Sequence, residues 1–104
     1  MAVARLTAVG AVDASFGSSG MALLPITGTH PGNLHAIQVA SGKVVAAGVK
    51  QNGAARSAIM TRFDDVAGAI DWNTSKVFGQ ANAAFYGLVL DASNWPIAVG
   101  SSLP

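Results

Sequence analysis

The chain has 104 residues, enough for one small domain, and 51% of them are hydrophobic while only 11% are charged, against about 25% in an ordinary soluble domain. Six Lys and Arg residues and five acidic residues leave a net charge of +1 with no basic run, which argues against a nucleic-acid partner, and polar residues interrupt every apolar stretch before it could span a membrane. The chain has no cysteine, so no disulfide framework or thiolate site is expected.

Short runs of apolar and β-branched residues, bounded by Gly, Asn, Asp, Ser or Pro, predict an all-β chain. In chain order, strands are expected over residues 3–8, 21–27, 34–40, 44–50, 57–64, 75–78, 85–91 and 96–101. Ser41-Gly42 and Asn52-Gly53 predict two-residue hairpin turns, because glycine adopts a positive φ without steric cost. Neighbouring strands are therefore expected to pair antiparallel.

The chain also repeats itself imperfectly. Arg5 and Asp13 return as Arg62 and Asp71, at offsets of 57 and 58, and residues 36–48 return as residues 87–100 at offsets of 51 and 52. An Arg and Asp pair is thus expected in each copy. Residues present in both copies more plausibly hold strand and loop geometry through charge-assisted hydrogen bonds than form an active site.

Three pieces of the first copy carry a family resemblance. They are Ala4-Arg5-Leu6, then Val12-Asp13-Ala14-Ser15-Phe16-Gly17-Ser18-Ser19-Gly20, then residues 36–48. In this order they resemble the delta-60 repeat, whose "ARY", "LDxSFGxxG" and "ALxxDGKIVVAG" pattern recurs in bacterial multi-repeat proteins similar to β-propellers. The likeness spans nearly the whole chain but is degraded in the second copy, where Trp72-Asn73-Thr74 and Asp91-Ala92-Ser93-Asn94-Trp95 replace two of its elements. It implies a propeller fold and no defined catalytic residues.

On this view residues 1–104 form one domain of two four-stranded antiparallel propeller blades. Residues 34–78 make one complete blade, and the other is split, with its strands c and d in residues 1–27 and its strands a and b in residues 85–101. The unpaired edges at 3–8 and 96–101 are expected to pair head to tail between copies and to close a ring. Propellers have roughly 4 to 8 blades, so the expected homo-oligomer has three copies, with four as the alternative. Two other interpretations stay open: a piece or subunit of a larger repeat protein, and a single-chain β-sandwich.

Residues that do not repeat are the better candidates for ligand binding. Around the predicted channel mouth the sequence places His30, Asn33, Asn52 and Arg56, together with Gln80 and Asn82. Trp72 and Trp95 belong to the opposite face, as a stacking platform for a sugar or protein ligand or as lids over the apolar core. His30 and His35 have no third ligand, and Asp64-Asp65 is expected to cap backbone amides rather than bind calcium, so neither a metal nor another cofactor is expected.

No known catalytic motif occurs in the sequence. The leading hypothesis is a non-enzymatic binding or scaffold module with a glycan or protein ligand. The alternatives are a structural subunit of a larger propeller and a hydrolase that uses a histidine at the channel mouth. No secretory signal or transmembrane segment is recognised at the sequence level, and the cellular compartment is not indicated.

Overall fold

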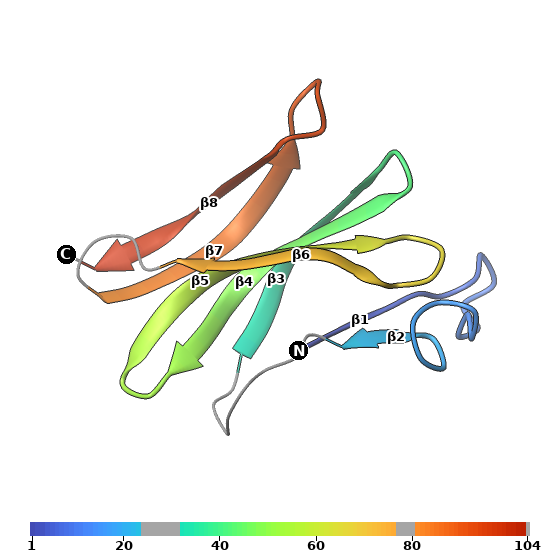
Figure 1. The fold of residues 1–104 in the computed structure, drawn as a ribbon, viewed down its shortest axis with the longest axis horizontal. Coiled ribbons are helices and arrows are strands. Elements are labelled where there is room, and N and C mark those ends of the chain that lie inside the picture. The colour runs from blue at the N-terminus through green and yellow to red at the C-terminus, as the bar shows by residue number, and fades with distance from the viewer. Residues whose placement is uncertain (24–31, 77–80, 104) are drawn as a thin grey trace.

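The computed structural model describes residues 1–23, 32–76 and 81–103, and these residues form antiparallel β-structure (Figure 1). The strands are β1 (Ala2–Ala4), β2 (Met21–Leu23), β3 (Gly32–Ala40), β4 (Lys43–Asn52), β5 (Ala55–Asp64), β6 (Ile70–Lys76), β7 (Ala81–Leu90) and β8 (Pro96–Leu103). The all-β class expected from the sequence is confirmed. Within the described residues, no helix is long and apolar enough to cross a membrane.

The strands form one four-stranded sheet and two hairpins. The central sheet has the order β3-β4-β5-β6, whereas β1-β2 and β7-β8 are separate two-stranded sheets. Figure 1 shows the two hairpins on opposite sides of the central sheet. The antiparallel pairing of chain neighbours is confirmed in all three sheets.

The tight turns follow from local backbone chemistry. Ser41 and Gly42 both have positive φ, 52° and 74°, as a primed two-residue turn between β3 and β4 requires. The second turn is shifted by one residue from the prediction. Asn52 still pairs with Ala55, so the turn residues are Gly53 and Ala54, with the positive φ of 59° on Gly53.

Two predicted strands differ most from those observed, and the limits of most of the others shift by one to four residues, as in β7, which was expected to begin at residue 85 and begins at Ala81. The strand expected over 3–8 ends at Ala4, because the chain turns at Thr7 to Gly10 and only an isolated bridge joins Leu6 to Val12. The strand expected over 75–78 runs instead over Ile70–Lys76, since pairing with β5 begins directly after the connecting turn. Residues 24–27 and 77–78 of the predicted strands lie outside the described residues.

Alternation along β4 and β5 creates two apolar clusters on opposite sides of the central sheet. The first cluster lies under the β1-β2 hairpin and contains Val3, Phe16, Ala22, Val44, Ala46, Ile59 and Phe63. The second lies under the β7-β8 hairpin and is built on Val45, Ala47 and Leu88, with Met60, Trp72 and Leu90 among the side chains packed against it. The central sheet is therefore covered on both faces, and each hairpin covers one of them.

Candidate binding site at one end of the strands

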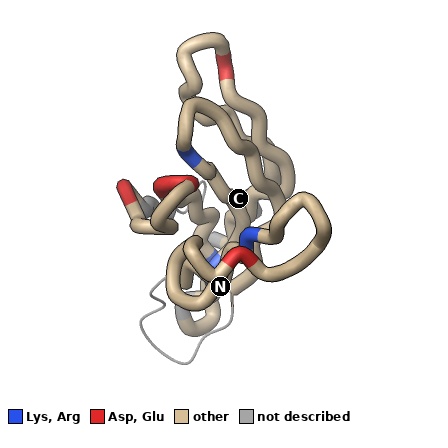
Figure 2. The backbone as a smooth tube through the Cα atoms, turned by 90° about the vertical axis from the view of Figure 1, so that its right-hand side faces the viewer, with Lys and Arg blue, Asp and Glu red and all other residues tan. Residues whose placement is uncertain are grey.

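The charged residues divide the molecule into two ends. All five acidic residues belong to the end that carries the β3-β4, β5-β6 and β7-β8 turns, here called the acidic end; they are Asp13, Asp64, Asp65, Asp71 and Asp91. Arg5, Lys43 and Arg62 also lie there, which leaves the acidic end with three cations against five anions, a net −2. Of the remaining cations, Lys50 and Arg56 lie near the β4-β5 turn at the other end, and Lys76 holds a register position opposite Ala58 in β5. Figure 2 looks onto the acidic end and shows its red segments on separate loops.

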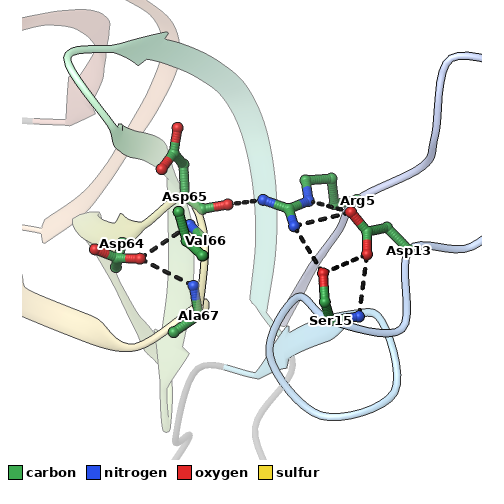
Figure 3. Close-up of polar contacts among 7 residues, drawn as sticks. All are labelled: Arg5, Asp13, Ser15, Asp64, Asp65, Val66 and Ala67. Atoms are coloured by element: carbon green, nitrogen blue, oxygen red, sulfur yellow. Dashed lines mark hydrogen bonds and ion pairs between the residues drawn. The ribbon is translucent and has the colours of Figure 1, made fainter.

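At the acidic end the structure contains both repeated Arg and Asp pairs. Arg5 Nη2 lies 2.8 Å from Asp13 Oδ2, and Arg62 Nε lies 3.1 Å from Asp71 Oδ2. Arg5 also donates to the carbonyl of Asp65, so it joins the β1-β2 segment to the turn of the central sheet (Figure 3). These residues fasten neighbouring turns, which is a structural role.

Hydrogen bonds and ion pairs at this end shift several ionisation equilibria. The hydroxyl and backbone amide of Ser15, and then Arg5, lower the pKa of the Asp13 carboxyl below its ordinary value. Lys43 does the same to the pKa of Asp71, from 2.8 Å, and Asp71 in turn raises the pKa of Lys43. Each charged form is stabilised by its partner in the folded chain.

Asp64 caps backbone amides, as expected from the sequence. Its Oδ1 accepts hydrogen bonds from the amides of Val66 and Ala67, both at 2.9 Å (Figure 3), and these bonds lower the pKa of the carboxyl. Across 1–23, 32–76 and 81–103 there is no group of three or more side chains suited to hold a metal ion. Through its two hydrogen bonds to backbone amides, Asp64 stabilises the β5-β6 turn.

The two tryptophans have different surroundings. Trp72 packs against the second apolar cluster, and the Arg62 guanidinium lies 5.6 Å from the centre of its ring. Trp95, at the β7-β8 turn, is 72% exposed. Only Trp95 offers most of its ring surface to a partner, and Trp72 covers the apolar core.

At the end opposite the acidic one, two adjoining hollows form what we call the polar trough. One of about 300 Å³ is lined by Gly32, Asn33, His35, Val49, Gln51, Arg56 and Tyr86. The other, of about 420 Å³, is lined by Gln51, Ala54, Arg56, Asn82, Ala84, Tyr86 and Ser101. The structure thus brings together the predicted residues Asn33, Arg56 and Asn82. His30, Gln80 and the side chain of Asn52 lie outside what the structure describes.

Tyr86 and Gln51 were missed at the sequence level, although the repeat contained a signal for Tyr86. Tyr86 and His35 are 51 residues apart, and each sits at a register irregularity, between Leu34 and Ala36 in β3 and between Phe85 and Gly87 in β7. A bulge re-aims its side chain. The two rings point toward one another, with centroids 5.2 Å apart.

Side chain to backbone hydrogen bonds hold the frame of the polar trough. The Arg56 amide donates to Asn82 Oδ1 at 3.1 Å, which ties the start of β5 to the start of β7, and Gln51 Nε2 donates to the carbonyl of Gly53 at 3.1 Å. The Arg56 guanidinium has no ion-pair partner among the described residues, since every carboxylate side chain lies at the acidic end. The polar trough therefore presents an available guanidinium beside an exposed phenol ring and several amides.

Comparisons of the chain with protein-family models, with curated proteins and with solved structures each return no match.

Proposed function

We propose that copies of this chain assemble head to tail into a closed β-propeller, which serves as a non-enzymatic binding scaffold. In this arrangement β8 of one copy pairs with β1 of the next, and the two hairpins together complete a second four-stranded blade. Both strands have one unpaired side, because β1 pairs only with β2 and β8 only with β7 among the described strands. The hairpins lie on opposite sides of the central sheet, so the two open edges of one chain face different neighbours.

The observation that carries the proposal concerns one apolar contact between β7 and β4. The residues on both sides of this contact have counterparts in the sequence repeat, and those counterparts are exposed. Inside the chain, Leu88 of β7 packs on Val45 and Ala47 of β4, which are 2% and 0% exposed. The repeat counterparts of Val45 and Ala47, at an offset of 52, are Ile97 and Val99 in β8. These two side chains are 52% and 65% exposed.

The other half of the contact is exposed on β3. The counterparts of Leu88 and Leu90, at an offset of 51, are Ile37 and Val39, which are 51% and 61% exposed. Two hollows of about 280 and 170 Å³ lie beside them, next to the open edge of β1. A second copy can place its Ile97 and Val99 against Ile37 and Val39, which repeats the internal contact. This contact would bury apolar side chains that are exposed to water in the single chain.

The pairing of β4 with β5 supplies a register for the joint between copies. Val45 pairs with Arg62 and Ala46 with Thr61 in the central sheet. Transferred by the repeat offsets, Ile97 would pair with Arg5 of the next copy, and Ala98 with its Ala4. The backbone of Ala4 is free for this role, since the amide and carbonyl of the adjacent Arg5 bond toward Gly20 and Asp13 on the other side of the strand.

Native mass spectrometry and light scattering test the assembly. We expect a discrete particle of three copies, or of four, since two blades per chain then give a ring within the roughly 4 to 8 blades of known propellers. A stably folded single chain, or an open series of ever larger species, would contradict a closed ring.

Val99→Lys tests the joint itself. Val99 is already 65% exposed, so the lysine should be tolerated in an isolated chain but would bury a charge between copies. The particle should fall to the mass of one chain while the far-ultraviolet β signal persists. Val9→Lys is the matched control, because Val9 is 90% exposed and lies in the turn after β1, away from the joint. If Val99→Lys still assembles, β8 does not form the interface between copies.

A further inference from the structure

We infer that the polar trough binds an acidic saccharide, that is, a sugar chain carrying carboxylate groups. The inference names the ligand class of the proposed scaffold. It rests on the proposed function in one respect, since only the ring would present several troughs to one saccharide. The trough itself is built within one chain, from β3, β4, β5 and β7. Ligand binding and ring assembly can therefore be tested separately.

The charge at the trough favours an anion. Arg56 lines both hollows, and its guanidinium has no ion-pair partner among the described residues, since the five aspartate side chains belong to the acidic end. A guanidinium binds a carboxylate through two parallel hydrogen bonds, and this geometry selects planar anions.

The remaining lining suits a sugar ring. Tyr86 is 54% exposed and lies in both hollows, so the part of its ring that His35 leaves uncovered can stack against the apolar face of a pyranose. Asn33, Gln51 and Asn82 are amides, which both donate and accept hydrogen bonds as the hydroxyls of a sugar do.

The frame of the trough is formed before any ligand binds. Arg56 and Asn82 are joined through a backbone amide, and Gln51 is held by the β4-β5 turn. The ring of Tyr86 is in contact with that of His35, which leaves it less freedom to lose on binding. Preorganisation of this kind raises affinity because less order has to be created in the complex.

The test uses the full chain and isothermal titration with three probes of similar length: a tetragalacturonate, a neutral galactotetraose and tetraglutamate. We expect binding of the tetragalacturonate, and affinity at least about tenfold lower for each of the others, because one lacks the charge and the other lacks the sugar rings. Equal binding of galactotetraose would overturn the role of charge. Equal binding of tetraglutamate would overturn the saccharide class, and no binding of tetragalacturonate would overturn the inference as a whole.

Variants locate the site. Arg56→Gln should lower the affinity for tetragalacturonate about tenfold or more, and Arg56→Lys should recover part of it, since the charge returns without the two-pronged geometry. Tyr86→Ala should weaken binding several-fold. Trp95→Ala is the matched control at the acidic end and should leave the affinity unchanged. Binding lost with Trp95→Ala but retained with Arg56→Gln would place the ligand at the opposite end and refute the trough.

Assembly is separated from binding with Val99→Lys. If the ring forms, this variant should keep the affinity of the parent for tetragalacturonate and lose at least about a hundredfold in apparent affinity for a polygalacturonate-coated surface, because only the ring presents several troughs at once. If the parent chain itself proves to be a monomer, the tetragalacturonate titration still tests the trough, so the two proposals fail by different measurements.

Discussion

The central sheet and the two flanking hairpins have apolar residues at equivalent positions of the sequence repeat, but these residues are buried to different extents. Val45 in the central sheet is 2% exposed, and its counterpart Ile97 in β8 is 52% exposed; Phe63 is 0% exposed, and its counterpart Leu6 is 57% exposed. The pattern determines which side of a strand each residue occupies. The depth of burial depends on what lies against that side, and among the described strands only those of the central sheet are covered on both faces.

The largest difference is expected from truncating the counterparts Phe63 and Leu6. Phe63→Ala removes a fully buried ring from the first apolar cluster and should cost about 3–5 kcal/mol of the free energy of unfolding, a large part of the stability of a domain this size. Leu6→Ala should cost less than about 1 kcal/mol. Urea unfolding followed by circular dichroism measures both. A similar loss for the two would mean that Leu6 is buried in the assembled particle.

The two tryptophans extend the comparison to aromatic side chains. Trp72→Ala removes a ring that packs on the second cluster and stacks with Arg62, and we expect a loss of about 2–3 kcal/mol in the free energy of unfolding. Trp95→Ala should change it by no more than about 0.5 kcal/mol. Thermal unfolding of the two variants side by side checks this. A large loss for Trp95→Ala would show that its ring is covered by another copy.

Two glycines at equivalent positions of the repeat should respond alike to substitution. Gly48 in β4 and Gly100 in β8 are counterparts, and a Cβ at either would collide with a backbone carbonyl of the adjacent strand, that of Asn33 or of Ala84. We expect Gly48→Ala and Gly100→Ala each to cost about 1–3 kcal/mol, as overpacking does. Melting temperatures of the variants provide the measurement. Unequal costs would show that the β7-β8 hairpin adjusts its strand spacing more easily than the central sheet.

The smallest effects are expected from the repeated carboxylates Asp13 and Asp71. Both have a lowered pKa, so their contribution to stability is complete above the ordinary carboxyl pKa of 3.8 and is lost as the pH falls below it through the folded-state pKa. Asp71→Asn and Asp13→Asn should lower the melting temperature slightly at pH 7 and very little at pH 3. A drop of equal size at both pH values would mean that the side chains act through packing rather than charge. Both carboxylates form ion pairs that remain partly exposed to water, which keeps the effect small.

Much of the fold was accessible from local pattern. The all-β class, the antiparallel pairing and the Ser41-Gly42 turn depend on backbone preferences that neighbouring residues set, and each is confirmed. The strand limits were less accurate at the ends of the repeat. Residues 5–8 were expected in a strand, but β1 ends at Ala4 and the chain turns at Thr7 to Gly10. Ile70–Lys76 pairs earlier than its polar sequence indicated, because the ladder with β5 supplies hydrogen bonds irrespective of side chain.

The candidate site was only partly accessible. Asn33 and Arg56 could be placed at one end from the order of strands and turns, and they do line one hollow. Tyr86 could not, because its approach to Arg56 depends on how the β7-β8 hairpin is set against the central sheet. Gln51 pairs with Arg56 across the β4-β5 hairpin, in a register set by a turn that was expected one residue earlier. Backbone bulges also turn His35 and Tyr86 toward one another, and a bulge has no clear mark in a single sequence.

By itself, then, the sequence determined the all-β class, the antiparallel pairing of neighbouring strands and the Ser41-Gly42 turn, since these follow from alternation and turn chemistry along a few neighbouring residues. Only the tertiary structure decided that the two hairpins cover opposite faces of one sheet. The same packing separates the acidic end from the trough around Arg56, because charge segregation emerges only when strands distant in the sequence are laid side by side.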